Sequence, residues 1–318
     1  MVINMYQDEY RRWLAADLED FDLKRELETI KDDDDAIKDR FAVALQFGTA
    51  GLRGTLGAGT NRMNIWVVRQ ATQGVADWVK TQGGTQTVAI SYDSRLKGSA
   101  FAKDAAGVLA ANGIKVRIYD ALMPVPALSF ATRYYKCNAG IMVTASHNPS
   151  KYNGYKVYGA DGCQMTTAAA NEVLGEIEKL DLFADSKRIA FEEGLKDGRI
   201  CYIPEEVYTA FVEEVKKQSV VGDALIDKNV AIVYTPLNGA GLKPVLRTLK
   251  ETGYTNITVV KEQEQPDGNF PTCPYPNPEI HEAMALGMEY AAKYNADLLL
   301  ATDPDSDRVG IAVKDKVG

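Results

Sequence analysis

The sequence predicts an α/β protein of two similar domains, each a mainly parallel mixed sheet sandwiched by helices. Two observations lead to this fold class. First, from residue 64 onward short apolar runs alternate with longer segments of helical periodicity, a pattern typical of parallel sheets with helices on both faces. Second, the order strand, helix, strand, helix, strand occurs twice, and each copy ends its third strand in a strongly polar loop.

Length and composition are those of an ordinary globular protein. The 318 residues suffice for two domains that each bury a core without disulfides or metals. The net charge of -8 argues against a broad surface for nucleic acid or anionic membrane, so a local cluster of cations must hold any bound anion. The 4 cysteines lack C-x-x-C spacing, and no apolar run approaches a signal sequence or membrane span. We therefore expect free thiols and a cytoplasmic protein.

The segment before the repeated pattern is expected to be helical first and glycine-rich later. An apolar stripe at roughly helical spacing predicts a helix over 8–31. The acidic run 32–35 interrupts it, and we interpret this run as a solvated turn or a helix cap. The segment 47–54 is interpreted as a glycine-rich loop that carries Arg53.

The first copy of the pattern begins at Asn64, which is expected to cap a helix. Gly113 should stop the second helix, and a proline at 124 or 126 should start the third. The predicted order is helix 64–80, strand 88–91, helix 99–112, strand 114–119, a third helix, strand 139–143, the alternating segment 155–158 and helix 166–180. A polar, acidic stretch to 198 closes the first domain, placed at 1–199.

The second copy occupies the second domain, placed at 200–318. Its predicted order is helix 205–217, strand 230–234, glycine loop 235–241, a helix to 252, strand 257–260, a proline-rich loop 265–278, helix 279–294 and strands 297–301 and 309–313. Ligands of such sheets bind beyond the carboxyl ends of the strands. The polar segments after residues 143 and 301 are therefore the candidate sites.

Three aspartates alternate in the second polar segment. On an extended backbone Asp303, Asp305 and Asp307 would project to one side. Carboxylates this close repel one another, and a hard divalent cation is the simplest way to keep them ionised. An EF-hand is excluded because Arg308 stands at the glycine position and Lys314 at that of the bidentate glutamate. Mg²⁺ completed by water and a phosphate oxygen fits better, and a solvated hairpin loop is the alternative.

The first polar segment offers Ser146, which has three interpretations. It can be an ordinary loop hydroxyl, a hydrolase nucleophile with His147 as base, or a phosphoryl acceptor. The hydrolase is disfavoured because adjacent side chains on extended backbone point apart and no G-x-S-x-G elbow is present. A phosphorylated serine would supply an oxygen ligand to a nearby cation. The groups that could balance its remaining charge are Lys151, Lys156, His147 and Arg308.

Other polar or aromatic residues are expected to be structural. His281, early in a predicted helix, should be a packed or capping residue. The tyrosines that should pack are Tyr152, Tyr155 and Tyr158. The segment 93–95 follows a strand end and could face the same cleft, but a turn with a solvated arginine is the preferred interpretation.

Four motifs in order connect these observations. They are 47–54; 144–149 with 152–156; 266–271 with 276–279; and 303–308. Together they closely resemble the α-D-phosphohexomutase family, the phosphoglucomutases and phosphomannomutases, and the resemblance spans essentially the whole chain. Ala50 in the first motif and the long helical N-terminus look most like the phosphoglucomutase/phosphopentomutase-type branch.

This resemblance implies an isomerase that interconverts sugar 1-phosphates and 6-phosphates through a phosphoserine, with Mg²⁺ as cofactor and glucose 1,6-bisphosphate as intermediate and activator. Glucose is the expected sugar, with mannose and pentose phosphates as alternatives. The implied residues are, for catalysis, Ser146, His147, Lys156 and Arg308; for substrate binding, Thr49, Arg53, Lys156 and Arg308; and for the metal, Ser146, Asp303, Asp305 and Asp307.

The family is built from four domains, and this sequence ends where the second should finish. We therefore expect domains 3 and 4 to be absent and turnover to be lost or severely reduced, because binding of the non-reacting phosphate normally helps to position the reacting one. Two other functions stay open. One is a phosphatase in which water takes the phosphoryl group, and the other is a non-enzymatic module that binds metal or sugar phosphate. The sequence leaves the oligomeric state open.

Overall fold

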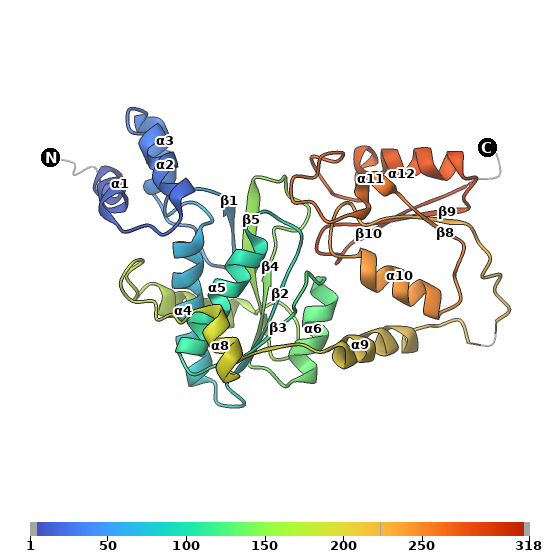
Figure 1. The fold of residues 1–318 in the computed structure, drawn as a ribbon, viewed down its shortest axis with the longest axis horizontal. Helices are drawn as coiled ribbons and strands as arrows, with labels where there is room; N and C mark the ends of the chain where they lie inside the picture. The colour runs from blue at the N-terminus through green and yellow to red at the C-terminus, as the bar shows by residue number, and fades with distance from the viewer. Residues whose placement is uncertain (1–4, 223, 315–318) are drawn as a thin grey trace.

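The computed structural model describes residues 5–222 and 224–314, and it contains two α/β units side by side (Figure 1). A six-stranded sheet forms the first unit and a four-stranded sheet the second, both mixed and mainly parallel. The predicted fold class is confirmed. Among the described helices, none has the length and apolar character that a bilayer crossing requires.

The six-stranded sheet has the order β1-β5-β4-β2-β3-β6. Its strands are β1 (Leu52–Thr55), β2 (Thr87–Tyr92), β3 (Lys115–Ile118), β4 (Ala139–Val143), β5 (Tyr152–Gly159) and β6 (Ile200–Tyr202). Its helices are α4 (Ile65–Thr81), α5 (Gly98–Ala111), α6 (Val125–Tyr134), α7 (Thr167–Ile177) and α8 (Phe191–Asp197). Successive residues of β2 pack on opposite faces, Val88 and Ile90 in the core that includes α4 and α5, Ala89 beside Leu128 of α6. Central strands buried on both faces explain the continuous apolar runs in the sequence.

The four-stranded sheet has the order β10-β9-β7-β8. Its strands are β7 (Ile232–Thr235), β8 (Ile257–Val259), β9 (Leu298–Thr302) and β10 (Val309–Val313), and its helices are α9 (Glu205–Lys217), α10 (Leu242–Glu251), α11 (Lys261–Glu264) and α12 (His281–Lys293). Helix α9 contacts both α6 of the first unit and α10 of the second, so it joins the two units (Figure 1).

The N-terminal part differs from the prediction. The single helix expected over 8–31 is wrong, because α1 (Met5–Ala15) and α2 (Phe21–Thr29) are separate, and α3 (Asp34–Phe41) follows them. Asp20 caps α2, and Asp33 of the acidic run caps α3 by accepting from the Ala36 amide. The acidic run is therefore a helix cap, one of the two roles expected for it.

Two short strands were not predicted. Strand β1 overlaps the end of the predicted glycine-rich loop 47–54 and pairs with β5, about 100 residues away, so no local pattern marks it. Strand β6 pairs with β3 and begins just beyond the predicted boundary at residue 199. The division at that residue stays a prediction, as do the outer limits of the two domains.

The connections that follow β4 and β9 lie against each other where the two units meet (Figure 1). We call residues 144–152 the serine loop and residues 303–308 the aspartate loop. The Val125 amide at the start of α6 donates to the Asp305 carbonyl at 2.9 Å, which ties the aspartate loop to the first unit. The carboxyl ends of β4 in the first sheet and β9 in the second therefore lie next to each other, as expected for a ligand site of such sheets.

Candidate active site

Ser146 follows β4 after two buried residues and has a φ of 53°, in the left-handed region. This conformation costs a non-glycine residue roughly 1–2 kcal/mol, so surrounding contacts must hold it. The Thr144 hydroxyl accepts from the Ser146 amide at 2.8 Å. As a result, Ser146 Oγ lies 3.2 Å from Nδ1 of His147. The expectation that these adjacent side chains point apart is wrong, because the backbone here is not extended.

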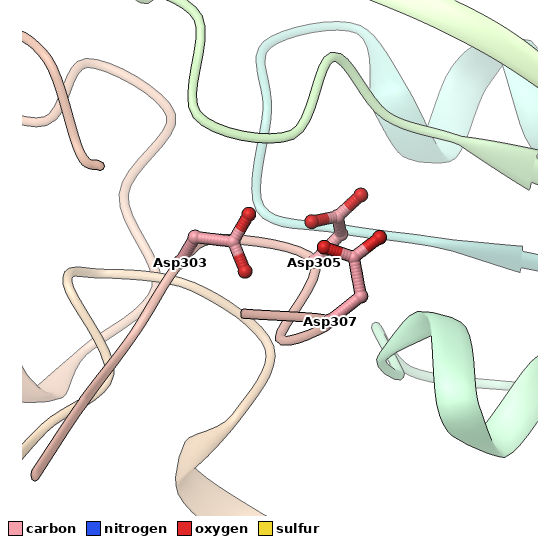
Figure 2. A group of neighbouring side chains, drawn as sticks. All are labelled: Asp303, Asp305 and Asp307. Atoms are coloured by element: carbon pink, nitrogen blue, oxygen red, sulfur yellow. The ribbon is translucent and has the colours of Figure 1, made fainter. Parts of the chain in front are cut away.

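The aspartate loop is a tight turn rather than the extended segment that was expected. The Ser306 and Arg308 amides donate to the carbonyl and the side chain of Asp303, at 2.9 and 3.1 Å. One carboxylate oxygen from each of Asp303, Asp305 and Asp307 lies within 4.8 Å of the others, and Figure 2 shows the three side chains gathered along the loop. The turn thus brings the carboxylates together by a different backbone path.

The two loops meet through side chains. The Ser146 hydroxyl donates to Asp303 Oδ2 at 2.9 Å. The Lys156 ammonium group, on β5, donates to Asp305 Oδ2 at 2.8 Å and lies 3.6 Å from Asp307 Oδ2. The side chains of Lys156 and Asp305 are only 4% and 0% exposed. Residues about 150 positions apart therefore form one polar cluster, which is buried except at Asp307.

The acid–base properties of the aspartates reflect crowding. Burial, and then the neighbouring charge of Asp305, raise the pKa of Asp303 to about 8. Burial also acts to raise the pKa of Asp305, but the charge of Lys156 and the hydrogen bonds to Asp303, Lys156 and Thr144 together keep that pKa below its ordinary value. Burial and the charge of Asp305 raise the pKa of Asp307. The single lysine thus does not compensate the three carboxylates.

This donor set fits a divalent cation. Asp305 Oδ1 is buried and has no hydrogen-bond partner among the described residues, so it is an oxygen free to coordinate. Carboxylate oxygens are the hard ligands that Mg²⁺ prefers, and few of them are needed when water and phosphate complete the shell. Ser146 Oγ, next to Asp303, can join them.

Two arginines lie close enough to His147, next to the serine, to affect its pKa. Arg53, exposed on β1, donates to Asn148 Oδ1 at 3.0 Å, and Arg308 donates to Glu279 Oε1 at 3.1 Å. Burial, then the charges of Arg308 and Arg53, lower the pKa of His147. These effects favour the neutral imidazole, which can accept a proton.

Thr49 lies at the exposed tip of the turn closed by mutual backbone hydrogen bonds between Gly48 and Gly51. A Cβ at Gly51 would lie 2.9 Å from Cα of Lys156 and closer still to the Tyr155 carbonyl, and its φ is 71°. Only glycine permits this approach, which brings the turn against the strand that carries Lys156.

The remaining expected residues fall outside the cluster. Lys151 is exposed, with its ammonium group 5.7 Å from the centre of the Tyr152 ring. Tyr155 and Tyr158 are buried, as expected. His281 is the first residue of α12 and is exposed rather than packed.

Sequence reasoning missed Arg95. The expectation of a solvated arginine is wrong, because its side chain is 0% exposed and donates to the Ser146 carbonyl at 2.6 Å. Asp93 is equally buried, and burial raises its pKa to about 6. The signal that could have found Arg95 was its position. The segment 93–95 follows β2, which pairs in parallel with β4, so the carboxyl ends of both strands lie at the same end of the sheet.

Two family models match the chain. The model described as phosphoglucomutase/phosphomannomutase, alpha/beta/alpha domain I, matches residues 44–183. The corresponding domain II model matches residues 208–318. Between them the two matches include the serine loop and the aspartate loop.

Individual proteins are similar over most of the chain. A Staphylococcus saprophyticus phosphoglucomutase is 40% identical over 85% of this chain and 48% of its own length. A Saccharomyces cerevisiae phosphoribomutase is 36% identical over 90% of this chain and 48% of its own length. The crystal structure of a candidate phosphomannomutase from Thermus thermophilus has a TM-score of 0.72 at 25% identity, covering 85% of this chain and 57% of that one. The chain spans about half the length of the curated relatives it matches.

Proposed function

Because the chain belongs to the phosphoglucomutase/phosphomannomutase family, we propose that it carries the phosphoserine and metal centre of a sugar-phosphate mutase. The reaction interconverts sugar 1-phosphate and 6-phosphate, with glucose as the expected sugar and glucose 1,6-bisphosphate as intermediate and activator. The observation that supports this most is the 2.9 Å contact between Ser146 Oγ and Asp303 Oδ2, which joins the candidate phosphoryl acceptor to the candidate metal ligands.

In the first step, Ser146 Oγ attacks one phosphorus atom of the bisphosphate. The Oγ–P bond forms while the bond from phosphorus to the sugar oxygen breaks. The hydroxyl proton passes to His147 Nδ1, 3.2 Å away, and the departing sugar oxygen takes a proton from Lys156. In the second step a hydroxyl group of the other sugar monophosphate attacks the phosphorus on Ser146, so a new bond from sugar oxygen to phosphorus forms while the Oγ–P bond breaks. The proton of that hydroxyl passes to Lys156 and His147 returns its proton to Ser146 Oγ, so the protein returns to its starting state.

The aspartates and Ser146 would hold Mg²⁺, which when bound supplies several kcal/mol of charge stabilisation to phosphoryl transfer. The protein's own cations have a different task. Arg308 and Arg53 neutralise the transferring group, while Thr49 and Lys156 complete the substrate contacts. Such transfer depends on positioning and charge more than on covalent chemistry, which suits a site built mainly from charged side chains.

The sugar class is tested by the fate of the phosphoryl group on Ser146. Phosphorylated protein is mixed with glucose 1-phosphate, mannose 1-phosphate, ribose 5-phosphate or buffer, and loss of the group is followed by mass spectrometry. Fastest transfer to glucose 1-phosphate supports the proposal. Preference for ribose 5-phosphate would assign a pentose mutase, which the similarity to a phosphoribomutase makes the second candidate. Equal loss in buffer alone would instead indicate a phosphatase.

A further inference from the structure

Arg95 is a fully enclosed cation that grips the serine loop. Its side chain is 0% exposed, and Nη1 donates to the carbonyls of Pro149 and Tyr152 at 3.0 and 2.9 Å. Nη2 donates to the carbonyls of Ser146, at 2.6 Å, and Asn148. Four carbonyls of one loop thus converge on a single guanidinium group. A lysine ammonium is a point charge without the planar fork that this arrangement uses.

The contacts of Ser146 explain what this grip achieves. Its amide donates to the Thr144 hydroxyl at 2.8 Å, and its carbonyl accepts from Arg95. Both backbone polar groups of a residue with a φ of 53° are therefore held by neighbouring side chains. These two hydrogen bonds offset the cost of the left-handed backbone of Ser146. That backbone conformation directs Oγ toward Asp303.

Asp93 links the two contacts. Its carboxylate accepts from the Thr144 hydroxyl at 2.6 Å and from the Arg95 amide at 3.0 Å. Asp93 Oδ2 also lies 3.5 Å from Arg95 Nε as an ion pair, and both side chains are 0% exposed. Arg95 and Thr144 thus approach Ser146 from two directions and are anchored on one buried carboxylate.

The second unit packs against the same arginine. The Arg95 guanidinium carbon lies 5.1 Å from the centre of the Phe270 ring. A Cβ at Gly268 would lie 2.5 Å from the Leu96 amide nitrogen and 2.7 Å from the Ser94 carbonyl, so the two backbones touch. Arg95 is therefore enclosed between the serine loop and the unit that supplies the aspartates.

We propose that Arg95 is a positioning residue that holds Ser146 in its left-handed conformation and so aims its hydroxyl at the aspartate loop and the reacting phosphorus. This inference rests on the proposed function, which it extends to a residue outside the reacting groups. Asp93 and Phe270 complete the device by fixing the guanidinium group from the first and second units.

The test compares wild type with Arg95→Lys, which keeps the charge and removes the fork. Arg69→Lys is the matched control, because Arg69 is also buried in the first unit but pairs with Glu19 and Asp104, away from the serine loop. Single-turnover phosphorylation of Ser146 by glucose 1,6-bisphosphate with Mg²⁺ gives a maximal rate constant and a half-saturating concentration. Hydrogen exchange of the amides of residues 144–152 reports the loop without any chemistry.

For Arg95→Lys we expect a maximal rate constant at least about tenfold lower with an unchanged half-saturating concentration, because misplacement of a reacting group affects the transfer step. In Arg95→Lys, amide hydrogen exchange should accelerate in the serine loop only. Arg69→Lys, compared with an Arg95→Lys variant of equal thermal stability, should show neither effect. If Arg95→Lys had the wild-type rate constant and the wild-type exchange rates, the role of Arg95 would be overturned, while the proposed function would stand. Absence of phosphorylation in wild type would overturn the proposed function. If the serine-loop amides of Arg95→Lys then also exchanged at the wild-type rate, the proposal that Arg95 holds Ser146 would be overturned as well.

Discussion

Lys156 on β5 and Asp305 in the aspartate loop form a buried ion pair across the two units, with Nζ and Oδ2 at 2.8 Å. The two side chains are 4% and 0% exposed, so neither charge is well hydrated. The pair is a direct electrostatic contact between the first unit and a candidate metal ligand. The same residues therefore form part of the candidate site and part of the contact between the two units.

Lys156→Met should therefore destabilise the protein and weaken the contact between its units. Removing one partner leaves the Asp305 charge buried without compensation, a loss of about 3–5 kcal/mol in the free energy of unfolding. Chemical denaturation checks this value, and the double variant Lys156→Met/Asp305→Asn should recover part of the loss. Wild-type stability of Lys156→Met would refute the importance of the pair.

Mg²⁺ binding should strengthen with rising pH up to about 8. Because the pKa of Asp303 is raised to about 8 in the metal-free protein, a proton competes with the cation below that pH. Calorimetric titration should give about a tenfold weaker affinity for each pH unit well below 8 and a plateau above it. Asp303→Asn should bind more weakly and lose this slope. A wild-type affinity independent of pH between 6 and 8 would contradict the assignment.

The same shift has a consequence for stability without metal. Asp303 keeps its proton in the folded state at pH values where the unfolded chain has lost it, so folding takes up a proton between about pH 4 and 8. The contribution of Asp303 to stability is therefore present below pH 4 and is lost as the pH rises through 8. Thermal melts of metal-free wild type and Asp303→Asn should diverge in this window, and parallel curves would contradict it.

Gly239→Ala should disturb the aspartate loop from the side of β7. A Cβ there would lie 2.4 Å from Cα of Pro304 and 2.7 Å from its carbonyl oxygen, so backbone must move, at a cost of about 1–3 kcal/mol. We expect lower stability and weaker Mg²⁺ binding by calorimetry. Gly175→Ala in α7 is the control, because a Cβ there meets nothing within 4 Å. Equal Mg²⁺ affinity in the two variants would contradict the role of Gly239.

Local sequence signals predicted the helices and strands whose ends are marked by capping or turn residues. Asn64 caps α4 by accepting from the Val67 amide, and α9 and β10 have the predicted bounds. Strand β1 could not be predicted in this way, because four residues become a strand only by pairing with β5. The break between α1 and α2 was marked by Asp20, but the continuous apolar stripe concealed it.

The candidate site divides in the same manner. Sequence spacing predicted Ser146 and the aspartates as candidate site residues, and the structure brings them together. Spacing could not predict the left-handed backbone of Ser146, which depends on Thr144 in the same loop and on Arg95 after β2. Arg95 itself was misjudged because an arginine beside a turn is usually solvated. Its burial arises from the serine-loop carbonyls and from Phe270, which lie far from it in the sequence.

Whether Ser146 and the aspartates form one phosphotransfer centre can be decided by intact mass and peptide mapping before and after incubation with glucose 1,6-bisphosphate and Mg²⁺. The controls are Ser146→Ala, Ser150→Ala in the same loop, and wild type with Mg²⁺ removed by chelation. We predict one added phosphoryl group on Ser146 in wild type and Ser150→Ala, and none in Ser146→Ala or without metal. No added group in wild type, or one that persists in Ser146→Ala, would contradict the phosphoserine assignment.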